Sequence, residues 1–522
     1  MRKLSVLILF LFAFTFPNAQ LKLIAESPEF EKPTSTAYQL VPFKNGNTLL
    51  FQILKRGEIN ITIYDVKHKQ KLSKRFKPNN KIFEGGSING IFEVNNDLIV
   101  MMRHLNEEKI PELYRVIIDG KTGDLKEDKK IAELMRLDRS QGYASGFGNV
   151  PQPMFFVKTN PHTEYYAVAI FNSFEPNRNK RIEIIFYDSE HKEISRSYFA
   201  SPDNKYKYLE YKDMAIVENK KVSVLAFAYN TAASGEKEKE LLLANLDKGA
   251  MAMTYIKSEF FKNIAVEAAF IKYNQVSQKI ILLANKLANK SDLKLRITLG
   301  DIREIEYDAL LVYIDPFAEK VEKVLNPYPA EANKKSIELF GKKSAYKGFP
   351  KDLCLNNDGS FSIVYEELTR IETQNLLYYE AGDIAILLFD KIGEEIKSYL
   401  IPKNNERDGD YPFRASAYIS GPSKSYFLFN DIEENDEKIM EGKKVKTIRG
   451  VKECDAFYFD LSGTNVLTRR QFLFGKSENK KDHYLGLFNI SVYNRATDEY
   501  MTLKQGKGGK DKNATIVWLK PE

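Results

Sequence analysis

Residues Ile184-Ile185-Phe186-Tyr187-Asp188 form an apolar run that ends in an aspartate, and a short polar turn leads from there to Ile194. Aspartate suits the start of a turn because its carboxylate accepts hydrogen bonds from the backbone N–H groups that follow. Apolar residues on both sides of such a turn predict two antiparallel strands.

The same unit occurs seven times along the chain. In six of the copies the next apolar residue comes six positions after the aspartate, and in the first copy it comes one residue later. Recurrence in every unit indicates a structural turn and not a catalytic carboxylate. The repeated residues are Asp65, Asp119, Asp188, Asp247, Asp315, Asp390 and Asp460.

A second hairpin precedes the Asp unit in several repeats. Its turns include Lys44-Asn45-Gly46-Asn47 and Asn356-Asn357-Asp358-Gly359, and Asn-Gly and Asp-Gly tolerate the positive φ that tight hairpins need. The six steps from Asp65 to Asp460 average about 66 residues. Four strands in each repeat, joined by hairpins, are the pattern of a β-propeller.

The two ends of the chain decide the number of blades. Three strand-like runs, at 485–492, 500–503 and 514–519, follow the seventh unit, and one spare run, 21–25, precedes the first. A closed ring leaves no exposed strand edge. We therefore expect an all-β protein with one domain, residues 21–522, built as eight four-stranded blades. Residues 21–25 would complete the last blade; a seven-bladed ring with a C-terminal appendage is the alternative.

The chain thus resembles the β-propeller superfamily, with a WD40-like or TolB-like architecture. Asn357-Asp358-Gly359-Ser360 looks like the inner hairpin turn of TolB-like propellers, whereas the Gly-His and Trp-Asp pairs of WD40 repeats are absent. The double glycine of kelch repeats occurs once, at Gly85-Gly86, and the chain has a single tryptophan, Trp518. The resemblance implies an architecture and no particular activity.

Composition excludes several classes of function. Lys and Arg number 78 against 71 Asp and Glu, and this excess is dispersed, which does not favour nucleic acid. Five His and two Cys supply too few ligands for a zinc site, so we expect no metal and no cofactor. Cys354 and Cys454 form either a disulfide or two buried thiols.

The N-terminus has the parts of a secretory signal peptide. Met1-Arg2-Lys3 precedes the apolar run 4–16 and then Pro17-Asn18-Ala19-Gln20. The run is too short to span a hydrocarbon core of about 30 Å, and no later segment is long enough. We expect residues 1–19 to be removed near Ala19 from an exported bacterial protein, periplasmic or extracellular and monomeric. The Asn-Ala-Gln ending resembles exported proteins of the Bacteroidetes.

Connections of unequal length divide the two faces of the predicted ring. Turns within hairpins are short, while the other connections are long: 135–153, 230–240, 286–306, 326–350, 367–383, 403–415 and 431–453. Binding residues are concentrated on loops over a rigid scaffold, so we expect function on the long-loop face; the alternative is that these loops reflect tolerated insertions. The acidic run within 431–437 is expected to be a solvated, mobile loop.

The links between blades carry aromatic and basic residues near the predicted axis. Tyr143, Tyr346, Tyr411 and Arg414 are the candidate ligand contacts, because Tyr and Arg supply contact area and directional donors. No catalytic motif is present. The sequence therefore predicts a non-catalytic binding protein of the cell envelope with a protein or glycan partner. The alternative is a propeller enzyme that acts on glycans or other extracellular substrates.

Overall fold

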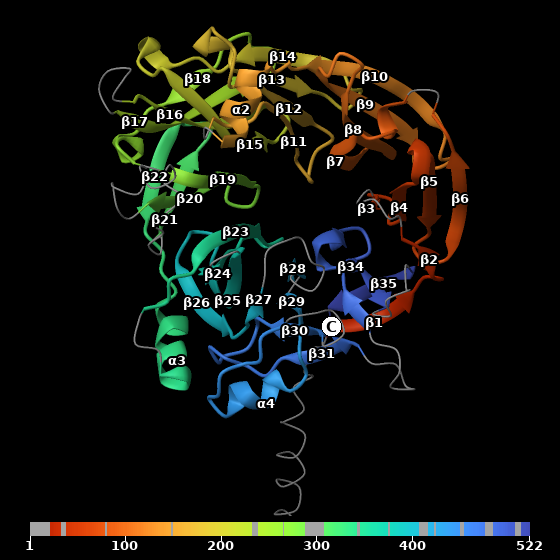
Figure 1. The fold of residues 1–522 in the computed structure, drawn as a ribbon, viewed down its shortest axis with the longest axis vertical. Helices are drawn as coiled ribbons and strands as arrows, with labels where there is room; N and C mark the ends of the chain where they lie inside the picture. Colours follow the sequence, from red (N-terminus) through yellow and green to blue (C-terminus); the bar gives the residue numbers. More distant parts are fainter. Residues whose placement is uncertain are drawn as a thin grey trace, which may run out of the picture.

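The computed structural model shows eight antiparallel sheets around a common axis (Figure 1). It describes residues 21–521 with these gaps: 33–37, 79–80, 148–149, 232–237, 265, 288–306, 342–344, 374–375, 407–415, 422–423, 449–453, 476–483 and 507–512. The predicted eight-bladed propeller is confirmed, and the seven-bladed alternative is wrong.

Each of the first seven blades is built from consecutive strands. Blades 1 to 4 are β3 (Tyr38–Pro42), β4 (Thr48–Ile53), β5 (Ile59–Tyr64), β6 (Gln70–Phe76); β7 (Ser87–Val94), β8 (Asp97–Leu105), β9 (Pro111–Asp119), β10 (Leu125–Glu133); β11 (Met154–Thr159), β12 (Tyr166–Phe171), β13 (Ile182–Tyr187), β14 (Glu193–Tyr198); β15 (Tyr208–Val217), β16 (Lys221–Tyr229), β17 (Lys239–Asp247), β18 (Thr254–Ile256). Blades 5 to 7 are β19 (Val266–Asn274), β20 (Lys279–Leu287), β21 (Tyr307–Asp315), β22 (Lys320–Leu325); β23 (Phe349–Leu355), β24 (Phe361–Thr373), β25 (Leu376–Phe389), β26 (Glu395–Ile401), with β27 (Asn405–Glu406) beside β25; β28 (Ser416–Ser420), β29 (Ser425–Asp431), β30 (Asp455–Asp460), β31 (Gln471–Phe474).

The eighth blade joins the two ends of the chain. It consists of β32 (Tyr484–Gly486), β33 (Val492–Asn494), β34 (Glu499–Gly506), β35 (Asn513–Pro521), β1 (Leu21–Glu26) and β2 (Phe30–Glu31). β1 pairs antiparallel with β35, from Leu21 opposite Pro521 to Glu26 opposite Val517, and Figure 1 shows the red first strand beside the blue last ones. The prediction that the N-terminal strand completes this blade is confirmed. A 3₁₀ turn, Phe488–Ile490, interrupts the predicted strand 485–492.

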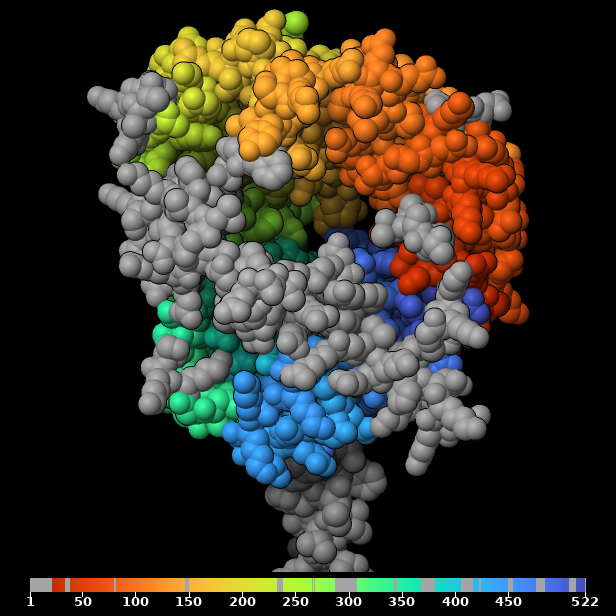
Figure 2. Space-filling view, in the orientation of Figure 1, coloured from red at the N-terminus to blue at the C-terminus, as the bar shows by residue number. Residues whose placement is uncertain are grey.

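Apolar side chains between neighbouring blades form the core. Every residue of β4 is buried, whereas the outer strand β6 alternates between half-buried and exposed residues. Phe51 and Ile61 of blade 1 pack in one cluster with Val100 and Val116 of blade 2. The core thus lies between the sheets, and the first strand of each blade lies next to the axis. Figure 2 shows the ring hollowed near its centre.

Asparagines at the turn between the first two strands tie one blade to the next. The amides of Asn160, Asn274 and Asn494 donate to the carbonyls of Ile216, Gly359 and Gly46, at 3.1, 2.6 and 3.1 Å. The same side chains each accept an N–H within their own turn. The asparagines therefore fix both the shape of a turn and its distance from the neighbouring blade.

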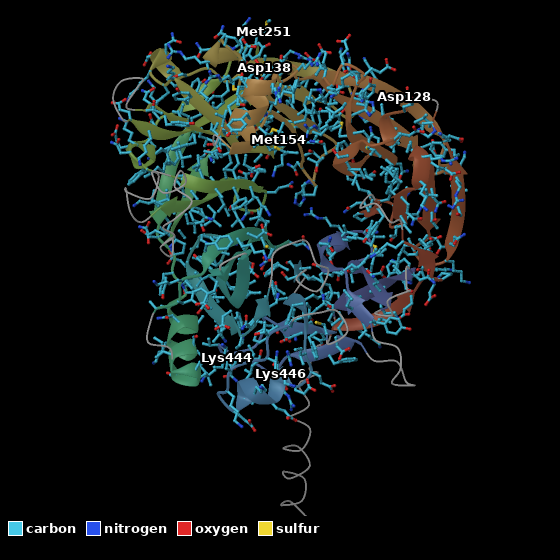
Figure 3. All side chains as sticks on the ribbon, viewed as in Figure 1. Asp128, Asp138, Met154, Met251, Lys444 and Lys446 are labelled. Carbon is cyan, nitrogen blue, oxygen red and sulfur yellow. The ribbon has the colours of Figure 1, made fainter. Side chains whose placement is uncertain are left out.

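Three helices lie in the described parts of the long connections: α2 (Arg139–Phe147), α3 (Ala330–Phe340) and α4 (Asn435–Met440). The N–H of Ala332 in α3 donates to Ser398 of β26 at 3.1 Å. Figure 3 labels Lys444 and Lys446 beside α4 and Asp128 at a distant edge of the ring, in line with dispersed charge. No helix of the described residues is long and apolar enough to cross a membrane.

The acidic run 431–437 differs from its prediction. Asp431 is fully buried and forms an ion pair with Arg470, which is also buried. The guanidinium of Arg470 also donates to the carbonyls of Ile432 and Glu433, at 2.6 and 3.0 Å. The expectation of a solvated loop is therefore wrong for Asp431, whereas Glu433, Glu434 and Glu437 are exposed. The run ends β29 and begins α4.

The two cysteines are free thiols. Cys454 is fully buried beside Ile432 and Ile448, and Cys354 is half-buried in β23. Of the two alternatives, the structure shows unpaired cysteines.

Candidate functional site

A cavity of about 440 Å³ lies at the axis, between blades 8, 1, 2 and 3. Its walls are the ends of β3, β7, β11 and β33 and the turns that follow them, with Val41, Phe92, Val94 and Tyr493 among the lining residues. These turns join the first two strands of each blade, so the cavity opens on the face of the short turns. The long connections follow the second and fourth strands and lie on the opposite face.

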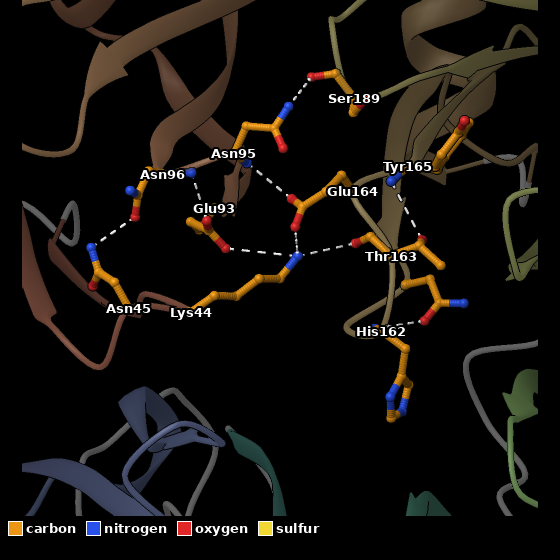
Figure 4. Close-up of polar contacts among 11 residues, drawn as sticks. Lys44, Asn45, Glu93, Asn95, Asn96, His162, Thr163, Glu164, Tyr165 and Ser189 are labelled. Carbon is orange, nitrogen blue, oxygen red and sulfur yellow. Dashed lines mark hydrogen bonds and ion pairs between the residues drawn. The ribbon is translucent and has the colours of Figure 1, made fainter.

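Lys44 links three of these blades (Figure 4). Its ammonium forms an ion pair with Glu164 of blade 3, lies 3.4 Å from the carbonyl oxygen of Thr163, and lies 4.0 Å from Oε2 of Glu93 in blade 2. The second carboxylate oxygen of Glu164 accepts the N–H of Asn95 at 2.9 Å. Both carboxylates at this end of the axis are therefore compensated by protein donors.

Glu93 is the more deeply placed of the two carboxylates. Its side chain is only 6% exposed, and Oε1 accepts the N–H of Asn96 at 2.7 Å. Burial raises the pKa of Glu93 above its usual value, and the neighbouring Glu164 adds to this effect. Asn45 reaches Asn96 at 2.7 Å, so the turns of blades 1 and 2 are joined beside the cavity.

His162 of blade 3 and Arg495 of blade 8 are in contact at the mouth of the cavity, the open end formed by the short turns. Nη1 of Arg495, which lines the cavity, lies 2.9 Å from Nδ1 and 2.8 Å from Nε2 of the imidazole. Burial, together with the charges of Arg495 and Lys44, lowers the pKa of His162 to about 4. The imidazole is therefore uncharged at neutral pH, and Figure 4 shows its ring pointing away from the Lys44 contacts.

Tyr493 adds a contact between blades 8 and 6. Its hydroxyl donates to Oδ1 of Asp498 at 2.6 Å and accepts the amide of Asn357 at 3.2 Å. Burial and the Asp498 carboxylate raise the pKa of Tyr493 to about 12. The phenol therefore keeps its proton and acts at neutral pH as a hydrogen-bonding group.

Of the four residues predicted to contact a ligand, the structure describes Tyr143 and Tyr346, and neither lines this cavity. Tyr143 is 68% exposed on α2, in the link that precedes β11. Tyr346 is buried in the core, where its hydroxyl donates to the carbonyl of Asp383 at 2.9 Å and accepts the N–H of Ala385 at 3.1 Å. This places Tyr346 between elements of the scaffold. Tyr411 and Arg414 lie outside the described residues.

Six of the seven repeated aspartates accept backbone N–H groups of the turn that they open. Asp390, for example, accepts the N–H groups of Ile392 and Glu394 at 3.0 and 2.8 Å. The others are Asp65, Asp119, Asp188, Asp315 and Asp460. Asp247 differs, because its side chain forms an ion pair of 3.1 Å with Lys221.

Sequence reasoning missed the residues at the axis. Lys44, Glu93, His162, Glu164 and Arg495 come from four blades and form no local motif. The available signal was positional: four of these residues lie in, and Glu93 just before, the turn between the first two strands of a repeat. Among the described residues, no group of three His, Cys, Asp or Glu could hold a metal ion.

Comparisons with known proteins show no family for this chain. No family model matches the sequence, and no curated protein matches it. The chain is similar in structure to polysaccharide lyase Uly1, at 10% identity and a TM-score of 0.41, over 95% of this chain and 100% of that one. It is also similar to the β-propeller domain of the Trilobed protease from Pyrococcus furiosus (12%, 0.35, 86% and 99%) and to the Nup133 β-propeller domain from Vanderwaltozyma polyspora (10%, 0.36, 83% and 99%). Likenesses of this level say nothing about activity, ligand or partner.

Proposed function

We propose that this chain is a non-catalytic binding protein that holds its ligand in the axial cavity between blades 8, 1, 2 and 3. The observation that carries the proposal is that two cations from different blades, Lys44 and Arg495, line this cavity. Arg495 also contacts His162, on which both charges act. Ligand sites are typically concave, mostly apolar and fitted with a few polar groups, with volumes of about 300–1,000 Å³. A cavity of about 440 Å³ with apolar walls and a charged rim fits that description.

The size of the cavity limits what enters it. It accommodates a small molecule, or the end unit of a larger protein or glycan partner, and not a folded domain. A partner of the second kind would extend beyond the cavity and contact the ring as well. Tyr143, Tyr411 and Arg414 are proposed contacts for a partner on the long-loop face; Tyr346 is not, because it is buried.

We also propose that the protein acts outside the cytoplasm of a bacterium. The support is the sequence of residues 1–19, which has the charged, apolar and small-residue parts of a signal peptide. Edman sequencing of the secreted protein tests this point, and a mature N-terminus near Gln20 is the expected result. A mature chain that still begins at Met1 would contradict it.

One observation favours the alternative, an enzyme that acts on glycans. His162 is uncharged at neutral pH and lies beside a guanidinium, so it could accept a proton from a bound substrate. An assay for depolymerisation of acidic and neutral polysaccharides separates the two functions. Release of shorter chains that is lost in His162→Gln would establish the enzyme, and binding without release supports the binding protein.

The binding proposal is tested by filling the cavity. Ala496 lines it, and Ala496→Trp would occupy its space without removing a charge. Ala318→Trp in the turn between β21 and β22, also exposed, is the matched control. Binding to an array of glycans and short peptides should be lost in the first variant and kept in the second. Equal binding by both variants would place the ligand elsewhere.

A further inference from the structure

We propose, resting on the function above, that the ligand carries a carboxylate or sulfate group, that Arg495 binds this anion at the mouth of the axial cavity, and that His162 takes up a proton when it does. The inference follows from the donors that Arg495 leaves unused and from the arrangement of charges around it.

Arg495 has more donors than partners. A guanidinium carries five N–H donors in a planar fork that matches an oxyanion in two places. Among the described residues, only Nη1 is engaged, by the ring of His162, and no carboxylate lies within ion-pair distance. Arg495 is thus a cation at a cavity wall whose fork remains available to an anion from outside.

The carboxylates near this end of the axis do not supply that anion. Glu164 is held by Lys44 and by the N–H of Asn95, and Glu93 is nearly enclosed and bound to the N–H of Asn96. The oxygens of both carboxylates are thus already bound to donors of the protein. Two cations from different turns, Arg495 and Lys44, act together on His162 at this end of the cavity. The mouth therefore favours an incoming anion.

Proton uptake follows from the same charges. His162 is flanked by Arg495 from the turn of blade 8 and Lys44 from the turn of blade 1, with Glu164 two residues along its own turn. Both cations disfavour the charged imidazole. A bound anion compensates them and raises the pKa of His162, so protonation and anion binding strengthen each other. Affinity for the anion should rise as pH falls from 7 toward the pKa of His162 in the ligand-free protein, which is about 4.

The residues that line the cavity indicate what the rest of the ligand is like. Val41, Phe92, Val94 and Tyr493 line the cavity behind the charged mouth. A ligand that fits both parts has an oxyanion at one end and a compact body with an apolar surface behind it. An acidic sugar unit and an aromatic acid share this chemistry, and binding measurements distinguish these two sources.

The test is titration calorimetry of the full mature chain with matched probes. Digalacturonate is compared with neutral digalactose, and 4-hydroxyphenylacetate with 4-hydroxyphenylethanol. We expect at least one acid to bind at least tenfold more tightly than its neutral counterpart. Arg495→Gln should lose this preference, while Arg75→Gln on β6, another exposed arginine, should keep it. Equal affinity for acid and neutral probes in the wild type, or no binding by either acid, would overturn the inference.

His162→Gln separates the proton from the anion. The wild type should bind its preferred acid at least threefold more tightly at pH 5 than at pH 7, whereas His162→Gln should keep the preference for the acid without this change. In NMR titrations, the pKa of the His162 ring should rise on addition of the acid. An unchanged pKa would overturn the proton uptake.

The experiment also distinguishes this inference from the proposed function. Binding of acidic and neutral probes that is blocked equally by Ala496→Trp, and that is insensitive to Arg495→Gln, would leave the cavity as a ligand site and reject the anion site. Binding that neither variant changes would reject both.

Discussion

The indole N–H of Trp518 donates a hydrogen bond of 3.3 Å to the hydroxyl oxygen of Thr48, across the join between the last blade and the first. Trp518 is buried, and its ring lies 5.4 Å from that of Tyr64 and 4.9 Å from that of His68. Because the chain has one tryptophan, its intrinsic tryptophan fluorescence reports the closure of the ring.

Leu21→Ala should weaken this closure. Leu21 is 4% exposed in a cluster with Val517 and Leu519, and truncating a buried leucine costs about 2–5 kcal/mol. We expect the urea midpoint followed by Trp518 emission to fall accordingly. The neighbouring exposed Lys22→Ala should change stability by less than about 0.5 kcal/mol; a similar loss in both variants would contradict the role of the buried leucine.

Asp119→Asn should lower the melting temperature in a pH-dependent way. An ion pair with Lys126 and the N–H groups of Lys121 and Thr122 hold the pKa of Asp119 well below its usual value. Its contribution is then complete above the unfolded pKa of about 3.9 and is lost as pH falls through the lower native pKa. The difference in melting temperature from wild type should be constant from pH 7 to 5 and shrink below pH 4. A difference that grows on acidification would reject this assignment.

Asp431→Asn should be the most destabilising change at the long-loop face. It removes the fully buried carboxylate partner of the Arg470 guanidinium and leaves only Asp436, whose Oδ1 lies 3.6 Å from Nε. Breaking a buried ion pair costs about 3–5 kcal/mol. Chemical denaturation measures the loss. Glu434→Gln, which changes an exposed member of the same acidic run, should have little effect. The double variant Asp431→Leu/Arg470→Met should recover part of the stability, and a larger loss than in Asp431→Asn would contradict this account.

Tyr346→Phe should affect stability and leave ligand binding unchanged. It removes the hydroxyl that bridges Asp383 and Ala385, and losing these hydrogen bonds costs about 1–3 kcal/mol. Thermal melting, together with recovery of the bound partner, separates the two effects. Tyr143→Ala should show the reverse balance, with stability within about 0.5 kcal/mol of wild type. Loss of binding in Tyr346→Phe with an unchanged melting temperature would return Tyr346 to the ligand site.

The architecture was predictable because it repeats. Each blade carries the same local signal, and an error in one copy, such as the interrupted strand at 485–492, does not change the count. The spare strand at residues 21–25 could be placed because a ring has one position left to fill. These conclusions depend on strand patterns and on the cost of an open edge, both of which can be read from sequence.

The axial residues could not be predicted in the same way. Lys44 and Glu164 are 120 residues apart. Their contact depends on where the ring places the turns of blades 1 and 3 relative to the axis. Burial of Asp431 depends on Arg470, which lies 39 residues away. Charged residues in loops are ordinarily solvated, so the sequence alone favours the wrong environment whenever a distant partner supplies the compensating charge.

The pairing of β1 with β35 also has a kinetic meaning. The partners Leu21 and Pro521 are about 500 residues apart in sequence, and closing so long a loop in an unfolded chain costs about 3–4 kcal/mol more than closing a loop of about ten residues. The intervening blades must therefore form first and bring the two strands together. Until then β35 presents an open edge to other chains. Refolding yield should consequently fall as protein concentration rises, because the strand synthesised first is the last to find its place.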